Sequence, residues 1–395
     1  MQRRNSLVPI LIICTLAIIG SVCTGCGGKN NDGQLLVTPT FTATPSPSST
    51  ATPTSTATPT PTVTPTPTPL PSLQREAKKH FLWIGTAIDP SYFSDPLFVE
   101  LLTHQFNMLT PEVAMKWEVI HPQPDSYDFK RADAIVEFSM ENDMLVRGHP
   151  LVWDMQLPDW VVKDYEEERY SREEWITILR EHIMTVAGHY QGQIYAWDVV
   201  NEAIADDGSL RDTIWLRTIG PEYIEMAFRW AHEADPEALL FYNESGGEGL
   251  NAKSEAVYSL VSGLLEKGVP IHGVGLQMHV ALDTPPTAEG LAENIQRLSN
   301  IGLRVHITEM DVRIQYSLAS EENKLASQAE MFRRVFSVCL DAVGCEAFIT
   351  WGPTDRHSWI PGYTGNPDAP LLFDKNYGPK PAYDAIMEVL EKAEK

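Results

Sequence analysis

Two short apolar segments each deliver one glutamate to a position where it could react. The first, YAWDVVNEA (195–203), leads to Glu202, and the second, HITEMDVR (306–313), leads to Glu309. A buried parallel strand that ends in a carboxylate is how a β/α barrel presents reacting groups. Two such carboxylates that face each other across one barrel mouth can act as a general acid/base and a nucleophile. The two segments therefore predict cleavage of a glycosidic bond with retention of configuration.

Strand-like and helix-like stretches alternate along the chain in a way that would bring these segments together. Eight β/α units within residues 74–395 predict a single (β/α)8 TIM barrel. A doubly wound sheet is the competing fold, but it would need a glycine-rich phosphate-binding turn or a switch-point site, and the sequence contains no GxGxxG or Walker motif. The expected strands are 82–88, 106–110, 145–153, 195–200, 239–243, 273–279, 304–312 and 347–351, and the longer expected helices are 172–190, 222–233, 252–267, 288–300, 321–343 and 382–392.

Polar and aromatic residues gather where these strands would end. In a barrel of this kind, the carboxyl ends of all strands meet at one mouth. The set combines carboxylates, amides, histidines and indoles, which suit a sugar: acids cleave the bond, polar groups bind hydroxyls and flat rings cover pyranose faces. Its members are Glu112, Lys116, His149, Trp153, Asn201, Glu202, Asn243, Gln277, His279, Glu309, Asp311 and Trp351.

Six motifs in a fixed order make the chemistry more specific. They are TPEVAMKW (110–117), RGHPLVW (147–153), WDVVNEA (197–203), GLQMHV (275–280), ITEMDV (307–312) and WGPTDRHSW (351–359). Together they resemble the endo-β-1,4-xylanases of glycoside hydrolase family 10, and PLLFDKNYGPKPAYDAI (370–386) resembles that family's C-terminal signature. The resemblance covers nearly all of residues 74–395. It implies hydrolysis of the xylan backbone with no cofactor. The sequence contains no HExxH or other close ligand set that would indicate a metal.

The resemblance also implies a role for individual residues. Glu202 would be the general acid/base, which must carry a proton when the leaving sugar departs, and Glu309 would be the ionised nucleophile. His279 and Asp311 would hold the charge and orientation of the nucleophile. Asn201 would bind the 2-hydroxyl of the sugar at the cleavage site.

The remaining implied residues would bind substrate. They fall into a cleavage subsite, the next sugar outward, an aromatic wall and the polar lining of the mouth. These are His149, Lys116 and Trp153 at the cleavage subsite, Glu112, Lys116 and Gln156 at the outer sugar, Trp351 and Trp359 in the wall, and Asn243 and Gln277 in the lining.

Three positions depart from the family pattern. Val113 stands where asparagine is usual, and it removes a polar contact at the outer sugar. Asp154 stands where histidine is usual, and we expect it to add negative charge near Lys116 or His149. Ser245 stands where an aromatic residue is common. These changes bear on subsite affinity and on the substrate, and they leave the two glutamates untouched.

Two other functions remain compatible with these residues. A family 10 relative with shifted specificity would act on a β-glucan or on short oligosaccharides. A degenerate barrel would only bind polysaccharide at the cell surface, although the intact pair of Glu202 and Glu309 argues against it. Release of reducing sugar from xylan and from carboxymethylcellulose separates the three.

The chain is strongly acidic, with a formal net charge of −23. Residues 1–75 carry four Lys and Arg residues against one Asp, a net of +3, which leaves −26 on the remaining residues. Such a surface repels nucleic acid and anionic lipid but tolerates a neutral polysaccharide. The alternative is that the acidity only aids solubility. We expect a xylan or xylo-oligosaccharide substrate, no nucleic-acid partner and a monomer.

The N-terminal residues have the composition of a processing signal. Arg3 and Arg4 precede an apolar run, 7–20, that is too short to span a bilayer comfortably. The small residues before Cys26 resemble a bacterial lipoprotein cleavage box. We therefore expect residues 1–25 to be a signal peptide of the lipoprotein type and Cys26 to be lipidated. An ordinary secretory signal peptide is the alternative.

A low-complexity segment follows this signal. Residues 26–73 are dominated by Thr, Pro and Ser, with no apolar periodicity between 38 and 72, so they predict a disordered linker. The linker would hold a catalytic domain, residues 74–395, away from a surface. The expected location is extracellular or on the cell surface, with possible membrane anchoring through the lipid on Cys26.

Two cysteines and two histidines of the domain complete the expectations. Cys339 and Cys345 flank a short turn between a helical run and a strand, and in an exported protein they predict a disulfide. Two free buried thiols are the alternative. His182 and His189 lie seven residues apart on one helical face, and we expect both on the surface.

Overall fold

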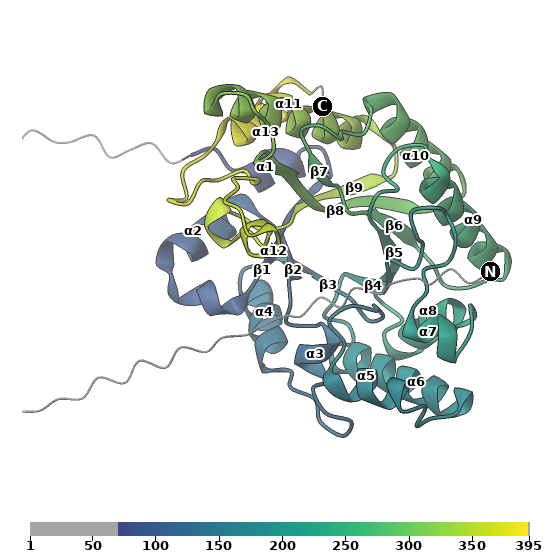
Figure 1. Ribbon diagram of the computed structural model, residues 1–395. Coiled ribbons are helices and arrows are strands. Elements are labelled where there is room, and N and C mark those ends of the chain that lie inside the picture. Colours follow the sequence, from purple (N-terminus) through teal and green to yellow (C-terminus); the bar gives the residue numbers. More distant parts are fainter. Residues whose placement is uncertain (1–69, 394–395) are drawn as a thin grey trace, which may run out of the picture. The chain divides into compact units, whose positions relative to one another are not determined.

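The computed structural model describes residues 70–393, and eight of the nine strands in this part of the chain close into a parallel barrel. The strands pair in the order β1, β2, β3, β4, β5, β6, β8, β9, and β9 returns to β1. Figure 1 shows this ring of strands inside a ring of helices, which confirms the predicted (β/α)8 barrel. The barrel strands are β1 (Trp83–Ile88), β2 (Met108–Pro111), β3 (Leu145–Gly148), β4 (Ala196–Asn201), β5 (Leu239–Glu244), β6 (Gly273–Leu276), β8 (Arg304–Arg313) and β9 (Cys345–Thr350).

The sixth expected strand is interrupted, and the interruption lies at the site. The sequence predicts one strand over 273–279, but β6 ends at Leu276 and β7 (His279–Ala281) pairs separately with the far end of β8. Between them, Met278 has a φ of 68°, in the left-handed region that breaks a ladder. The break places Gln277 beside β8, where its carbonyl oxygen accepts the Glu309 N–H at 2.9 Å.

The third expected strand, 145–153, is also shorter than predicted. β3 ends at Gly148, and the chain beyond it touches β4 through the Leu151 and Val152 N–H groups. Gly148 must lack a side chain, because a Cβ there would lie 2.2 Å from the Trp197 ring. The close contact allows β3 to pack against the fully buried Trp197.

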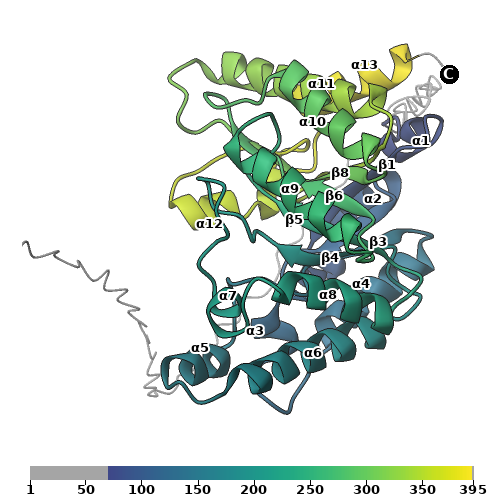
Figure 2. The same ribbon diagram turned by 90° about the vertical axis from the view of Figure 1, so that its right-hand side faces the viewer.

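The helices cover the outside of the barrel (Figures 1 and 2), where α11 packs against α13 and α6 against α8. The six longer helices that periodicity predicts are present, with ends that differ by at most two residues. The remaining helices had no predicted residue ranges. The helices are α1 (Leu73–Lys78), α2 (Pro96–Gln105), α3 (Trp117–Ile120), α4 (Lys130–Glu141), α5 (Asp159–Glu166), α6 (Arg172–His189), α7 (Ile214–Thr218), α8 (Tyr223–Ala234), α9 (Ala252–Glu266), α10 (Ala288–Asn300), α11 (Glu321–Asp341), α12 (Ile360–Thr364) and α13 (Pro381–Lys392), with 3-10 turns η1 (Pro90–Ser94) and η2 (Asp355–His357).

The prediction that His182 lies on the surface is wrong. Its ring is fully buried, stacks on Trp117 at 3.6 Å and meets the Nδ1 atom of His121 at 3.1 Å. The seven-residue spacing correctly puts His182 and His189 on one face of α6, but Trp117 and His121 cover that face only around His182. His189 stays exposed and pairs with Asp133 at 2.9 Å.

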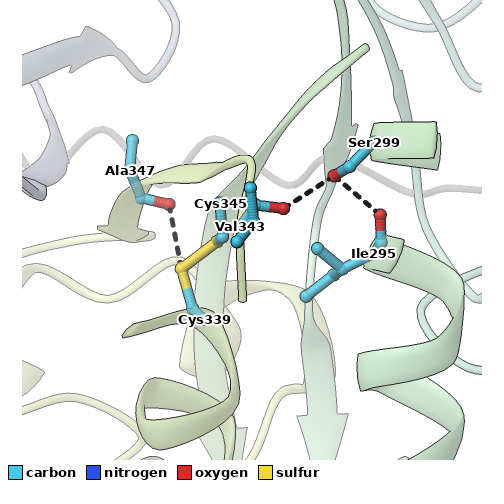
Figure 3. The surroundings of a disulfide bond; sticks show 6 residues. All are labelled: Ile295, Ser299, Cys339, Val343, Cys345 and Ala347. Carbon is cyan, nitrogen blue, oxygen red and sulfur yellow. Dashed lines mark hydrogen bonds between the residues drawn. A yellow bond between two sulfur atoms is a disulfide. The ribbon is translucent and has the colours of Figure 1, made fainter. Parts of the chain in front are cut away.

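The predicted disulfide is present. Cys339 of α11 and Cys345 of β9 are joined, with an S–S distance of 2.01 Å (Figure 3). The enclosed turn is also tied to α10, because the Ser299 hydroxyl donates to the Val343 carbonyl oxygen at 2.9 Å. The bridge therefore fixes the start of β9, at the end of the barrel opposite to the mouth.

The predicted signal peptide, Cys26 and all but the last residues of the Thr/Pro/Ser-rich linker lie outside the described residues. Within residues 70–393, no helix is both long and apolar enough to cross a membrane.

Candidate active site

The two glutamates come from β4 and β8, strands that β5 and β6 separate in the barrel, and their backbones differ. Glu309 lies within β8 and is only 4% exposed. Glu202 directly follows β4 and has a φ of 56°, so the chain turns out of the strand in a left-handed conformation. Its N–H still donates to the Asn243 carbonyl oxygen at 2.9 Å.

A continuous chain of amide hydrogen bonds joins the two carboxylates. Gln277 Nε2 donates to Glu202 Oε1 at 3.0 Å and to Asn201 Oδ1 at 3.2 Å. Asn243 Nδ2 donates to the same Asn201 oxygen at 2.8 Å and to Glu309 Oε1 at 2.6 Å. Asn201 Nδ2 is buried without a hydrogen-bond partner among the described residues. Three amides predicted from the sequence thus lie between the glutamates.

The position of Asn243 depends on its neighbours. The Thr308 hydroxyl donates to Asn243 Oδ1 at 2.8 Å. A Cβ on Gly275 would lie 2.1 Å from that oxygen, so a glycine in β6 makes room for the amide. Sequence reasoning placed Asn243 in the lining of the mouth but missed its direct bond to Glu309. The signal was an asparagine at the end of one strand and a glycine in the next.

A second set of side chains holds the other oxygen of Glu309. His279 Nε2 lies 3.1 Å from Glu309 Oε2, and His279 Nδ1 lies 2.8 Å from Asp311 Oδ2. The Trp359 indole N–H donates to the same Asp311 oxygen at 2.9 Å. The structure therefore brings together the predicted histidine, aspartate and tryptophan around one carboxylate.

The charges in this set are matched. Burial alone would lower the pKa of His279, but the carboxylates of Asp311 and Glu309 outweigh burial and raise it to about 10. Burial alone would raise the pKa of Glu309, but attraction to His149 and the bonds from His279 and Asn243 bring it below its ordinary value. Glu309 is thus held ionised beside a protonated His279.

A buried ion pair further down the strands supports His149. Arg147 binds Asp198 through Nε, at 3.1 Å, and through a second guanidinium nitrogen, and Asp198 Oδ2 also lies 3.0 Å from His149 Nδ1. Arg147 Nη1 contacts His306 Nδ1 at 2.8 Å. Burial keeps the pKa of His306 well below its ordinary range, and the positive charge of Arg147 acts in the same direction. Sequence reasoning missed Arg147, Asp198 and His306, although all three lie in or beside the quoted motifs.

The residues predicted for the outer sugar form one cluster. Lys116 Nζ donates to Gln156 Oε1 at 2.7 Å and lies 4.9 Å from the centre of the Trp153 ring. Burial lowers the pKa of Lys116 despite its acidic neighbours. Glu112 is half-buried, and burial raises its pKa to about 7 although Lys116 opposes the shift. Gln156 Nε2 in turn donates to Glu118 Oε1 at 2.7 Å.

The two tryptophans predicted as a wall stand against the histidines of the site. Trp351 meets His149 edge to face at 5.0 Å and His279 at 6.0 Å. Trp359 lies 5.2 Å from His279. Flat apolar rings therefore border the charged groups.

Asp154 binds the start of a neighbouring helix. Asp154 Oδ1 accepts the Ile214 N–H at 2.8 Å at the start of α7, and burial raises the pKa of this carboxyl. The charged side chains that act on this carboxyl are Arg211, Asp212 and Arg217. Val113 is half-buried, and its carbonyl oxygen accepts the Lys116 N–H.

Within residues 70–393, no cluster of three or more His, Cys, Asp or Glu side chains could hold a metal ion.

Comparison with known proteins shows which family this chain matches. The model of glycosyl hydrolase family 10 matches residues 72–389. Endo-1,4-beta-xylanase B of Thermotoga neapolitana is 44% identical over 319 residues, which cover 80% of this chain and 90% of the relative. Xylanase 10B from Thermotoga petrophila RKU-1, solved with xylobiose, has a TM-score of 0.78 and 46% identity to this chain. The match covers 81% of this chain and 97% of that xylanase chain. Native xylanase 10B from Thermotoga maritima has a TM-score of 0.78 and 47% identity, with 81% and 98% covered. The chain belongs to glycosyl hydrolase family 10.

Proposed function

We propose that this protein is a retaining endo-β-1,4-xylanase in which Glu309 is the nucleophile and Glu202 the general acid/base. One observation carries the assignment of roles. The Glu309 carboxylate lies between a protonated histidine and an amide donor, whereas the Glu202 carboxylate accepts a single amide hydrogen bond from Gln277. The first arrangement suits a group that stays ionised, and the second suits a group that must gain and lose a proton.

In the first step, a Glu309 oxygen attacks the anomeric carbon of the xylose at the cleavage site. The bond from that carbon to the leaving oxygen breaks, and Glu202 donates its proton to the leaving oxygen. The product is a xylosyl ester on Glu309. Asn201 Nδ2, which has no partner among the described residues, is the donor we assign to the 2-hydroxyl of this sugar.

In the second step, the Glu202 carboxylate takes a proton from water as the water oxygen attacks the anomeric carbon. The ester bond breaks and returns Glu309 to its ionised form. His279 and Asn243 stabilise the departing carboxylate, because both already bind it in the free enzyme. Two inversions at one carbon give net retention.

Substrate binding follows from the groups around these glutamates. We assign His149, Lys116 and Trp153 to the cleavage subsite, Glu112 and Gln156 to the next sugar outward, and Trp351 and Trp359 to the wall that covers a pyranose face. We also propose that the protein is monomeric and that a lipid on Cys26 anchors it to the cell surface through the linker 26–73.

Release of reducing sugar from xylan and from carboxymethylcellulose tests the activity. We expect release from xylan, little from carboxymethylcellulose, and none from xylan with the Glu309→Ala variant. Proton NMR of the first-formed product should show the β-anomer before mutarotation. Comparable activity on carboxymethylcellulose would point to a β-glucanase, and binding of xylan without hydrolysis would contradict the enzyme.

A further inference from the structure

The backbone around Glu202 is unusual for a residue with a side chain. Its φ of 56° lies in the left-handed region, which residues other than glycine rarely adopt. Such a conformation persists only when surrounding contacts determine it. The direction of the Glu202 carboxyl therefore depends on what holds residues 202–204.

On one side, three successive N–H groups are bound by three successive residues at the end of β5. Each contact uses a different kind of acceptor: a carbonyl oxygen, a phenol and a carboxylate. The Glu202 N–H donates to Asn243 O at 2.9 Å, the Ala203 N–H to Tyr242 Oη at 3.0 Å, and the Ile204 N–H to Glu244 Oε2 at 3.0 Å.

On the other side, the three carbonyl oxygens of residues 202–204 are all bound by Arg211. Its Nε donates to Glu202 O at 2.8 Å, its backbone N–H to Ala203 O at 2.7 Å, and its Nη2 to Ile204 O at 3.4 Å. Arg211 Nη2 also lies 3.9 Å from Glu202 Oε2. One residue therefore fixes the turn from the side opposite to β5.

Glu244 is a costly residue to place here, because it is a carboxylate that is 1% exposed. Its Oε1 pairs with Lys253 Nζ at 3.2 Å, and Lys253 is itself 3% exposed. Its Oε2 accepts the Tyr242 hydroxyl at 2.5 Å as well as the Ile204 N–H. The ion pair thus leaves one oxygen oriented toward the backbone that follows Glu202.

We propose that Glu244 and Arg211 are positioning residues for the acid/base: they fix the left-handed turn at Glu202 so that its carboxyl points at the glycosidic oxygen. This inference rests on the role proposed for Glu202. Neither residue needs to touch the nucleophile, so loosening the turn impairs proton donation and leaves attack by Glu309 in place.

Substrates with different leaving groups separate the two effects. Xylotriose needs a proton on its departing oxygen, whereas a 2,4-dinitrophenyl xyloside needs none. For Glu244→Gln and Arg211→Lys, we expect kcat/KM to fall roughly tenfold to hundredfold on xylotriose and by less than about threefold on the aryl xyloside. Arg211 is partly exposed, so its variant provides the test if Glu244→Gln does not fold.

Glu248→Gln is the matched control. Glu248 is a carboxylate of the loop that follows β5 and is 8% exposed, and it accepts the Gly246 and Met278 N–H groups with no hydrogen bond to residues 202–204. Any loss in this variant should be equal on both substrates. Equal losses, or no loss, in both Glu244→Gln and Arg211→Lys would overturn the inference.

Glu202→Ala distinguishes this failure from a failure of the proposed function. If Glu202→Ala discriminates between the two substrates but the positioning variants do not, only the inference is wrong. If Glu202→Ala itself shows no discrimination, the role proposed for Glu202 is wrong.

Discussion

The protein fixes the two glutamates through different atoms. Glu309 is held by its carboxylate: Asn243 binds one oxygen and His279 the other. Glu202 is held mainly by its backbone, and its carboxylate accepts one hydrogen bond, from Gln277, with Arg211 Nη2 farther off at 3.9 Å. A nucleophile must keep its charge, so fixed donors help it. An acid/base must exchange a proton twice per turnover, so strong donors on its carboxylate would hinder it.

The largest effect should come from removing the nucleophile. Glu309→Ala should reduce turnover to background on both xylan and a 2,4-dinitrophenyl xyloside, because no other group can form the glycosyl ester. Far-UV circular dichroism would check that the variant is folded. Loss on xylan alone would contradict the comparison, since that behaviour belongs to the acid/base.

His279→Asn should weaken the electrostatic support of the nucleophile without removing it. Hydrogen bonds to charged groups contribute about 1.5–3 kcal/mol, so we expect kcat/KM to fall roughly tenfold to hundredfold. Without the cation, the pKa of Glu309 rises, and the acid limb of the pH profile should move to higher pH. A profile of kcat/KM against pH measures this shift. An acid limb that stays in place would show that His279 does not set the charge of Glu309.

The disulfide provides a contrast with the mouth, because it lies at the other end of β9. Cys339→Ala with Cys345→Ala should lower the free energy of unfolding by about 2 kcal/mol, as expected for a short loop. Activity at 25 °C should not change. Urea unfolding and the xylan assay measure the two quantities, and alkylation of both thiols in the enzyme denatured without reductant would show that the bond is absent.

The smallest effect should come from the outer sugar. Val113→Asn restores a donor and acceptor, worth about 0.5–1.5 kcal/mol if it binds a sugar hydroxyl. Valine offers some apolar contact to a pyranose face, which opposes the gain in part. We expect kcat/KM to rise on xylo-oligosaccharides that fill this subsite and not on an aryl xyloside. An equal gain on both would mean that residue 113 does not face that sugar.

The features of the fold that depend on local periodicity could be predicted from the sequence. Alternating runs gave the eight barrel strands and the six longer helices, and the residues after each strand gave the polar side chains of the mouth. The resemblance then singled out Glu202 and Glu309. The match of the family 10 model to residues 72–389 confirms that resemblance.

What the sequence did not reveal depends on contacts between distant residues. His182 is buried because Trp117 and His121 cover it, and nothing within α6 indicates this. The left-handed backbone of Met278 splits a strand whose apolar pattern looks continuous. The contacts of Glu244 and Arg211 with residues 202–204 likewise arise only when the loop after β4 folds over the end of β5.

One measurement tests the difference between the two glutamates most directly: the mass of Glu202→Ala after mixing with a 2,4-dinitrophenyl xyloside. This substrate forms the ester on Glu309 without an acid, but water then attacks slowly because the base is missing. We predict a covalent xylosyl adduct that maps to the peptide containing residues 306–313. The double variant Glu202→Ala/Glu309→Ala should form no adduct. A variant that turns over without an adduct, or an adduct on another peptide, would contradict the assignment.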